Sequence, residues 1–481
     1  MSRMTRSESE VLVVGAGPTG LTLAIELARR GIATRLIDRA GPGESGSRGK
    51  GLQPRTLELF DLAGLLEPFV HAGALYPPMR VRWGPLALPI GRLSTPVAAT
   101  PAEPQPNLWM VPQFKTEELL RTKLESLGGR VEHHTELRGF TMGEDTVEAE
   151  LDGATVRANF LVGCDGGKSL VRKTLGLSLQ GEALPGRGMI VADVLLSGQD
   201  RRHWDMWPLA SGGLVTICPL PGTDLYQLIA MCRSEPAAGE LLLGPLGQRV
   251  ARATGGRVEV LEVRSASIYR PHVRMVTQYR VGRVLLAGDA AHVHPPAGGQ
   301  GLNTGVQDAF NLGWKLARVL RGASAELLDT YQAERLPVAA GVLGLSKRLM
   351  MKRSVRRGDE EKQLRLTYRN GPLGGGEETS RGQRAGDRAP DAPVVREDGS
   401  STRMFELLRS GAPTVIDLRA VEERRWPAGV VAHHLRPTAA FRAIYGDATA
   451  LLVRPDGYLG AVSVGSSVEV LRAAAAKWSL S

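Results

Sequence analysis

The sequence predicts an α/β protein in three parts: a three-layer nucleotide-binding domain built from discontinuous segments, an inserted and mostly antiparallel β domain, and a small C-terminal α/β domain. Three observations lead to this prediction. A strand, a glycine turn and a helix open the chain, strand signals dominate residues 186–280, and strand and helix signals alternate again near the C-terminus. The expected boundaries are 1–75, 107–185 and 276–357 for the nucleotide-binding domain with its following helices, 76–106 and 186–275 for the insertion, 358–391 for a connector, and 392–481 for the last domain.

Length and composition are those of a globular protein with two or three domains. The chain has 481 residues, of which 42% are hydrophobic, enough for proper cores. Its N-terminus is polar, without a signal-peptide apolar region, and no apolar run approaches membrane-spanning length. Three widely spaced cysteines show no metal-ligand pattern, so we expect a cytoplasmic protein with no metal site and no membrane contact. The net charge of +10 is spread along the chain, so we expect no nucleic-acid partner.

The first motif lies at the start of the chain. Glu10–Val14 predicts a buried strand, residues 15–20 read GAGPTG, and Leu21–Arg30 has helical spacing. In such a turn the first glycine reverses the chain, the second admits a pyrophosphate, and the third lets helix and strand pack closely. A second strand, Ala33–Ile37, ends at Asp38, where an acid binds ribose hydroxyls. The unit predicts a Rossmann-like site for a dinucleotide, and the acid favours FAD or NAD over NADP.

A basic loop follows, over residues 47–60. It carries Arg48, Lys50 and Arg55 and leads into a helix whose expected N-cap is Thr56. The residues leave two interpretations of Arg48 open, contact with the cofactor's phosphates or ring and a solvated basic loop.

A second acidic turn follows strand signals at 130–134 and 147–151 and a helix expected over 116–127. The strand 160–163 ends near Asp165, which is followed by two glycines and two basic residues. This segment is either a second phosphate- or ribose-binding turn or a simple turn.

Residues 186–280 are expected to form a sheet that covers the substrate. Strand signals occur at 189–195, 213–220, 226–231 and 258–269, with few helical patterns between them. Aromatic and polar groups of the kind that line a pocket for a flat ligand come from His203, Trp204, Trp207 and Tyr226, although each could equally pack within the sheet.

The third motif, Val281–Leu320, organises the chain. A strand over Val284–Ala287 ends at Asp289, two prolines stiffen the next loop, and residues 298–301 read GGQG before a helix that begins near Leu302. Free N–H groups at a helix N-terminus suit a ligand that gains negative charge, such as a flavin on reduction. An ordinary strand–loop–helix joint is the alternative. Two more helices are expected over 327–335 and 337–352, followed by a polar, glycine-rich connector over 358–391.

Taken in order, the three motifs closely resemble those of the class A flavoprotein monooxygenases, the para-hydroxybenzoate hydroxylase-like aromatic hydroxylases, over nearly the whole chain. Residues 451–458, LLVRPDGY, look like the thioredoxin-like appendage of the branch that hydroxylates polyketides and phenols, including anthracycline and angucycline precursors and rifamycins. The resemblance implies a glutathione-reductase-type FAD domain and a C-terminal thioredoxin-like domain. The latter contains no cysteine, so it performs no dithiol chemistry.

The resemblance also implies site residues. The glycine turn would hold the FAD pyrophosphate, Asp38 the adenosine ribose, and Asp165 both FAD and NAD(P)H. Arg48 would act in flavin mobility, and the carbonyl of Pro296 would face the substrate; these two are the catalytic candidates. The implied cofactor contacts are Gly15, Gly17, Pro18, Thr19, Gly20, Asp38, Arg39, Arg48, Gln113, Arg121, Leu137, Asp165, Asp289, Gly298, Gly301, Leu302 and Asn303.

The implied reaction uses FAD, NADPH or NADH, and O2 to hydroxylate an electron-rich, polycyclic polyketide-type aromatic through a flavin C4a-hydroperoxide, in a monomer or homodimer. No protein nucleophile is expected, and His203 and His272 are the candidates for a base that deprotonates a phenol. Baeyer–Villiger oxygenation of a ketone on the same scaffold is the alternative, and a flavin-binding module without turnover is a second. A halogenase is disfavoured because residues 204–208, WDMWP, lack the W-x-W-x-I-P spacing.

Overall fold

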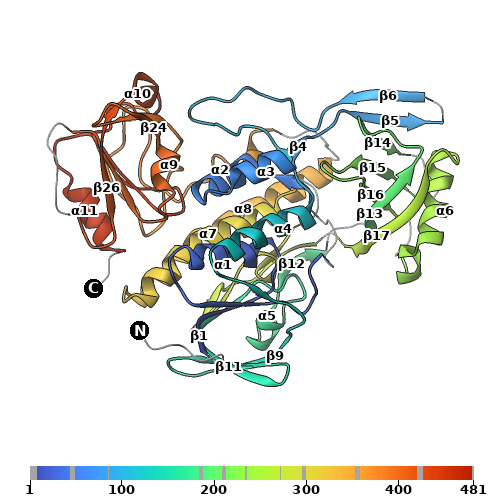
Figure 1. The fold of residues 1–481 in the computed structure, drawn as a ribbon, viewed down its shortest axis with the longest axis horizontal. Coiled ribbons are helices and arrows are strands. Elements are labelled where there is room, and N and C mark those ends of the chain that lie inside the picture. Colours follow the sequence, from blue (N-terminus) through green and yellow to red (C-terminus); the bar gives the residue numbers. More distant parts are fainter. Residues whose placement is uncertain are drawn as a thin grey trace.

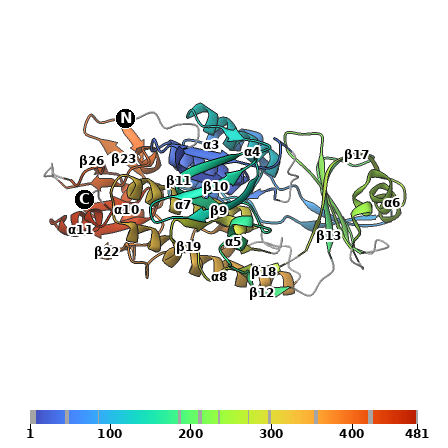
Figure 2. The same cartoon turned by 90° about the horizontal axis from the view of Figure 1, so that it is seen from below.

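The computed structural model describes residues 8–43, 49–84, 86–183, 188–208, 213–232, 236–270, 272–294, 299–352, 358–419 and 426–478. Three bodies lie in a row, with the nucleotide-binding domain in the middle, the β-rich domain at one end and the C-terminal domain at the other (Figures 1 and 2). The predicted α/β fold class is confirmed.

The nucleotide-binding domain is built on one mostly parallel sheet with the strand order β19-β20-β11-β1-β2-β8. Both faces of such a sheet are covered, so Val11–Val14 of the central strand β1 is apolar and buried. Helix α1 packs against both α4 and α7 over this sheet (Figure 1). An antiparallel hairpin, β9–β10, extends β11; its first strand was not predicted. The elements are β1 (Glu8–Val14), α1 (Pro18–Ala28), β2 (Thr34–Ile37), α4 (Gln113–Ser126), β8 (Val131–Glu132), β9 (Leu137–Met142), β10 (Val147–Leu151), β11 (Ala154–Gly163), α5 (Leu170–Thr174), β19 (Arg280–Val281), β20 (Val284–Leu286) and α7 (Gly301–Leu320).

Two helix predictions need correction. The helix α2 (Pro54–Leu62) begins at Pro54, whose fixed φ suits the first helical position, so Thr56 lies inside the first turn and is not the N-cap. The two helices expected around residue 336 are one, α8 (Asp329–Lys352), which continues through Pro337. Proline removes one helical hydrogen bond, but Tyr331 and Ala339 on either side are fully buried, and this packing keeps the helix continuous. The short helix α3 (Leu66–Ala72) follows α2.

The β-rich domain is a seven-stranded sheet in the order β17-β13-β16-β15-β14-β5-β6, antiparallel except where β14 pairs with β5. The helix α6 (Leu243–Thr254) packs on β17 and was not predicted, because two glycines and a proline obscure the buried spacing of Leu246, Val250 and Thr254. Two three-stranded sheets, β3-β7-β4 and β12-β18-β21, complete this region. The strands are β3 (Gly51–Leu52), β4 (Ala74–Leu75), β5 (Met79–Trp83), β6 (Leu86–Gly91), β7 (Trp109–Met110), β12 (Gln180–Ala183), β13 (Met189–Ser197), β14 (Trp204–Trp207), β15 (Val215–Pro219), β16 (Tyr226–Met231), β17 (Glu259–Tyr269), β18 (His272–Met275) and β21 (His292–Val293).

The C-terminal domain is a second seven-stranded sheet, in the order β22-β28-β27-β25-β26-β23-β24. The polar segment 358–391 leads to this domain and contributes β22 to its sheet. Three apolar side chains of the segment are buried, Leu364, Tyr368 and Leu373. The elements are β22 (Gly375–Gly376), β23 (Pro393–Arg396), β24 (Ser401–Arg403), α9 (Met404–Leu408), β25 (Thr414–Asp417), β26 (Val431–Pro437), α10 (Ala439–Tyr445), β27 (Ala450–Val453), β28 (Leu459–Ser463) and α11 (Glu469–Ala476).

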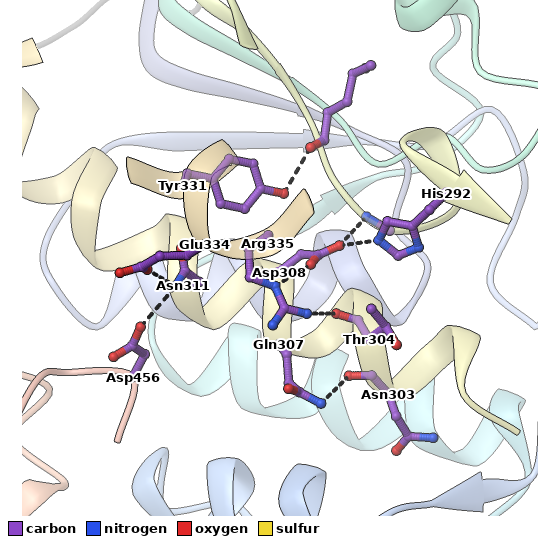
Figure 3. Close-up of polar contacts among 12 residues, drawn as sticks. His292, Asn303, Thr304, Gln307, Asp308, Asn311, Tyr331, Glu334, Arg335 and Asp456 are labelled. Carbon is purple, nitrogen blue, oxygen red and sulfur yellow. Dashed lines mark hydrogen bonds and ion pairs between the residues drawn. The ribbon is translucent and has the colours of Figure 1, made fainter. Parts of the chain in front are cut away.

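A buried ion cluster joins this domain to α7 and α8. Arg454, just after β27, forms two contacts with the Glu334 carboxylate, at 2.6 and 2.8 Å, and also binds Asp456 at 2.7 Å. Lys315 of α7 binds Glu334 at 2.8 Å, and Asn311 donates to both Glu334 and Asp456 (Figure 3). All five side chains are buried.

Charge pairing decides the protonation of this cluster. Burial alone would raise the pKa of Glu334, but the charges of Arg454 and Lys315 outweigh it and hold the pKa well below its ordinary value. Burial lowers the pKa of Lys315 to about 8, and the Glu334 charge offsets only part of this effect. Because about 8 is still above neutral pH, both groups are charged at pH 7.

We expect Arg454→Met to lower the free energy of unfolding by about 3–5 kcal/mol, because Glu334 and Asp456 then lose a buried partner. Urea denaturation at pH 7 measures this. The control is Arg436→Met, since Arg436 is exposed and donates only to a backbone carbonyl among the described residues. Equal stability of the two variants would contradict the importance of the cluster.

Candidate active site

A cavity of about 700 Å³ runs from the nucleotide-binding domain to the β-rich domain. Its lining at one end comes from the glycine turn after β1, the end of β2 and the Asp165 turn. At the other end it comes from residues of β14, β16 and β17, and from Tyr76, Leu93 and Leu108. The three sequence motifs and the β-rich sheet therefore share one cavity.

The glycine turn has the form that a pyrophosphate requires. Gly15 has φ +103°, and a Cβ there would lie 2.4 Å from the carbonyl oxygen of Cys164. A Cβ on Gly20 would lie 1.9 Å from the carbonyl oxygen of Gly15, so this glycine allows helix and turn to pack. Gly17 differs, because a Cβ there would meet no described atom within 4 Å. The space beside Gly17 faces the cavity and is left for a ligand.

Two acids border this end. Asp38 accepts hydrogen bonds from the backbone N–H of Ala16, at 2.6 Å, and of Ala40, at 2.8 Å, so it fixes the turn as well as lining the cavity. Asp165 accepts from the N–H groups of Leu170 and Val171 through Oδ2. Its Oδ1 is buried and has no hydrogen-bond partner among the described residues. A hydroxyl-rich ligand offers the missing donor.

The structure gathers most of the implied cofactor contacts around this cavity. Asn303 is an exception, since its buried side chain accepts from the Gln53 N–H and the Thr56 hydroxyl and donates to the carbonyls of Gly51 and Gly299. Asn303 therefore ties the start of α7 to α2 behind the cavity wall. Gly20 is also absent from the lining, and its role is to let α1 pack against the glycine turn. Arg48, Pro296 and Gly298 lie outside the described residues. The implied contacts that line the cavity are Gly15, Gly17, Pro18, Thr19, Asp38, Arg39, Gln113, Arg121, Leu137, Asp165, Asp289, Gly301 and Leu302.

Of the four proposed substrate residues, only Trp204 lines the cavity. Trp207 is buried in the core of the β-rich sheet, and the Tyr226 hydroxyl donates to the carbonyl of Gln199. His203 lies against Asp200, with Nδ1 3.1 Å from Oδ1. His272, the second candidate base, is on β18 outside the lining, and burial together with Arg274 and Arg270 lowers its pKa.

Strand alternation explains what the sequence prediction missed. Tyr226 and Leu228 of β16 face the sheet's core, whereas Gln227 and Ile229, which alternate with them along the strand, line the cavity. The polar residue Gln227 within an otherwise apolar strand was the sequence signal that could have indicated which face of β16 lines the cavity. The other lining residues that were not predicted at this end are Lys50, Tyr76, Leu93, Leu108, Tyr269 and His294.

The comparisons with known proteins agree with this geometry. Residues 8–346 match the family described as "FAD binding domain", and residues 382–479 match "Aromatic-ring hydroxylase, C-terminal". A flavin-dependent monooxygenase of Mycobacteroides abscessus is 40% identical over 94% of this chain and 97% of its own.

The chain belongs to the FAD-dependent aromatic-ring hydroxylases.

This hydroxylase is also similar to solved structures of other hydroxylases. The anhydrotetracycline hydroxylase of Streptomyces rimosus is 30% identical and superimposes with a TM-score of 0.78, over 98% of this chain and 99% of that one. Aklavinone-11 hydroxylase, solved with FAD and aklavinone, is 26% identical with a TM-score of 0.82, over 99% of each chain. The enzyme is an FAD-dependent monooxygenase, and its open Gly17 cradle and the unpaired Asp165 oxygen fit that cofactor. Among the described residues, no helix is long and apolar enough to cross a membrane, and no group of acidic, His or Cys side chains could hold a metal ion.

A hydrogen-bonded chain of two histidines and an aspartate lies beside the start of α7. His292 Nε2 is 2.6 Å from Asp308 Oδ2, and His292 Nδ1 is 2.9 Å from His294 Nε2 (Figure 3 shows the first of these contacts). Arg335 donates to Asp308 Oδ1 at 2.7 Å. Burial alone would raise the pKa of Asp308, but His292 and Arg335 outweigh it and lower the pKa to about 2. Burial lowers the pKa of His294, which lines the cavity, well below its ordinary range.

We expect Gly17→Ala in this hydroxylase to weaken FAD binding about tenfold or more while leaving the free energy of unfolding of the apoprotein nearly unchanged. The added methyl meets no described protein atom but occupies the space that faces the cavity. Fluorescence titration of apoprotein with FAD, with urea denaturation in parallel, measures both quantities. Gly239→Ala, where a Cβ also has open space but lies outside the cavity lining, is the matched control. Unchanged FAD affinity in Gly17→Ala would place the pyrophosphate elsewhere.

We expect Asp308→Asn to destabilise the hydroxylase by about 3–5 kcal/mol at pH 7, because Arg335 loses its buried partner. The folded-state pKa of about 2 lies below the ordinary value of 3.8, so the stabilising contribution of Asp308 is complete above about pH 4 and is lost as pH falls through 2. The difference from wild type should therefore shrink over that interval. Thermal unfolding from pH 7 to pH 2 measures it, with the exposed Asp224→Asn as control. A difference that is independent of pH would contradict the assignment.

Proposed function

We propose that this hydroxylase adds one oxygen atom from O2 to a polycyclic, polyketide-type aromatic substrate, with NADPH or NADH as reductant. The observation that carries the proposal is the continuity of the cavity, which joins the glycine-rich cofactor end to an end lined by Tyr76, Trp204 and Tyr269. Flat aromatic rings are the ligands that such side chains favour.

The chain's own residues position and shield the reactants. The N–H groups around Gly301 and Leu302, at the N-terminus of α7, favour an anionic ring edge through the helix dipole. Asp165 and Asp289 line the cavity, where they can bind hydroxyl groups, and residues of the β-rich sheet line its far end. When bound and reduced, FAD supplies the activation of O2.

The relatives support the substrate class. A Streptomyces rimosus enzyme named 12-dehydrotetracycline 5-monooxygenase/anhydrotetracycline 6-monooxygenase is 34% identical over 94% of both chains. That enzyme and aklavinone-11 hydroxylase are both named for substrates with several fused rings. Because the aklavinone enzyme is named a hydroxylase, we propose ring hydroxylation rather than Baeyer–Villiger oxygenation as the reaction of this enzyme.

The proposal also covers the cellular compartment, which we expect to be the cytoplasm, and the oligomeric state. All three cysteines are unpaired, which agrees with a reducing cytoplasm. We further propose a monomer or homodimer.

The test is stopped-flow reduction of the bound FAD by NADPH, with and without anthraquinone and naphthacenequinone phenols. A ligand of the right class should accelerate reduction at least about tenfold, because the substrate completes the site before reduction. Mass and NMR analysis of the product then locates the added oxygen. Oxygen on an aromatic carbon supports the proposal, whereas oxygen inserted beside a ketone identifies Baeyer–Villiger chemistry. Loss of all NAD(P)H oxidation would indicate a flavin-binding module without turnover.

A further inference from the structure

Lys50 places a positive charge in the wall of the substrate end of the cavity. It lies just before β3, lines the cavity, and is only 8% exposed. Its Nζ lies 4.3 Å from the centre of the Trp204 ring, and Trp204 lines the cavity as well. The Cys218 thiol lies close enough to interact weakly with Nζ, and the geometry gives Nζ no regular hydrogen bond to any other described residue.

The surroundings of this ammonium group are apolar. Tyr76, Leu93, Leu108, Met110 and Cys218 form the adjacent cluster, against which Trp204 packs. Burial raises the pKa of the Cys218 thiol, and the nearby Lys50 charge offsets part of this rise. The thiol therefore gives Lys50 no counter-charge.

Other charged groups of the β-rich sheet have their own partners. Asp205 accepts from Arg80 at 2.8 Å and from Arg82 at 3.3 Å. Asp193, which pairs with Gln227 across the strands, accepts from the Ser265 hydroxyl at 3.2 Å. No ion pair among the described residues joins Asp205 to Lys50.

A buried cation without a carboxylate is unfavourable, since it has lost its hydration. The face of Trp204 compensates for part of this cost, because the ring's π electrons attract a cation. A negative charge arriving in the cavity would compensate for more. In the low dielectric of this pocket the attraction acts over several ångströms, so the ligand need not touch Nζ.

We propose that Lys50 supplies the counter-charge for an ionised hydroxyl of the substrate, and that the substrate class is therefore an acidic phenol or enol on a fused ring system. This inference rests on the proposed function, because it assumes that the aromatic substrate occupies this end. The hydroxyl proton leaves to solvent on binding. The resulting oxyanion makes the ring more electron-rich, which favours attack on an electrophilic oxygen.

The test is a pH titration of alizarin, a three-ring phenol whose neutral and ionised forms absorb differently, bound to the oxidised holoenzyme. Ionised alizarin absorbs at longer wavelengths than flavin, and the measurement needs neither NADPH nor turnover. We expect bound alizarin to ionise about one pH unit or more lower in wild type than in Lys50→Met. Lys50→Arg should keep the low midpoint because it keeps the charge. The exposed Lys477→Met should behave as wild type.

Each outcome decides the proposal. Equal midpoints in wild type and Lys50→Met would show that the ammonium only packs on Trp204, and failure of alizarin to bind wild type would equally overturn the inference. If the Lys50→Met variant does not retain FAD, the proposal is tested on the wild-type enzyme alone, by comparing its affinities for two ligands. It should bind alizarin at least about tenfold more tightly than the dimethyl ether, which cannot ionise, and equal affinities would overturn the proposal. If wild type binds ionised alizarin preferentially but oxidises no NAD(P)H, the role of Lys50 as counter-charge is supported and the proposed oxygenation is contradicted.

Discussion

The buried polar face of helix α7 is the constraint on which the rest of the structure depends. Asp308, Asn311 and Lys315 project from one helix into the protein interior, and each is matched by a partner on α8 or after β27. Figure 3 shows the contacts of Asp308 and Asn311. Removing Glu334, Arg335 or Arg454 would leave a buried charge without its partner, so these contacts stabilise the observed arrangement of α7, α8 and the C-terminal domain. That arrangement also fixes the N-terminus of α7 at the cavity.

The two ends of the cavity are built by different means. At the cofactor end, absent side chains create the space, and backbone N–H groups and acids provide the contacts. At the end lined by the β-rich sheet, alternate residues of β16, Gln227 and Ile229, form the wall together with Trp204. The first end suits one cofactor closely, while the second is adaptable, since a change of side chain on a strand alters the wall without moving the backbone.

The local sequence pattern was sufficient to predict a structure where the interactions that form it lie within one short segment. The turn from Gly15 to Gly20 was recognisable because its steric needs are met within a few residues and by one neighbouring strand. The strand and helix around Asp289 were predicted for the same reason. Local pattern could not predict the hydrogen bond between Thr56 and Asn303, because it joins α2 to α7 across a separation of 247 residues.

The sequence by itself therefore determined the α/β class, the order of the three motifs and the family to which they belong, because these follow from local spacing. Only the tertiary structure decided which residues of the β-rich sheet line the cavity. Gln227 lines the cavity and Tyr226 does not, because the register of β16 against β13 and β15 sets the exposed face. Lys50 became a candidate only when folding buried it beneath Trp204 without a carboxylate.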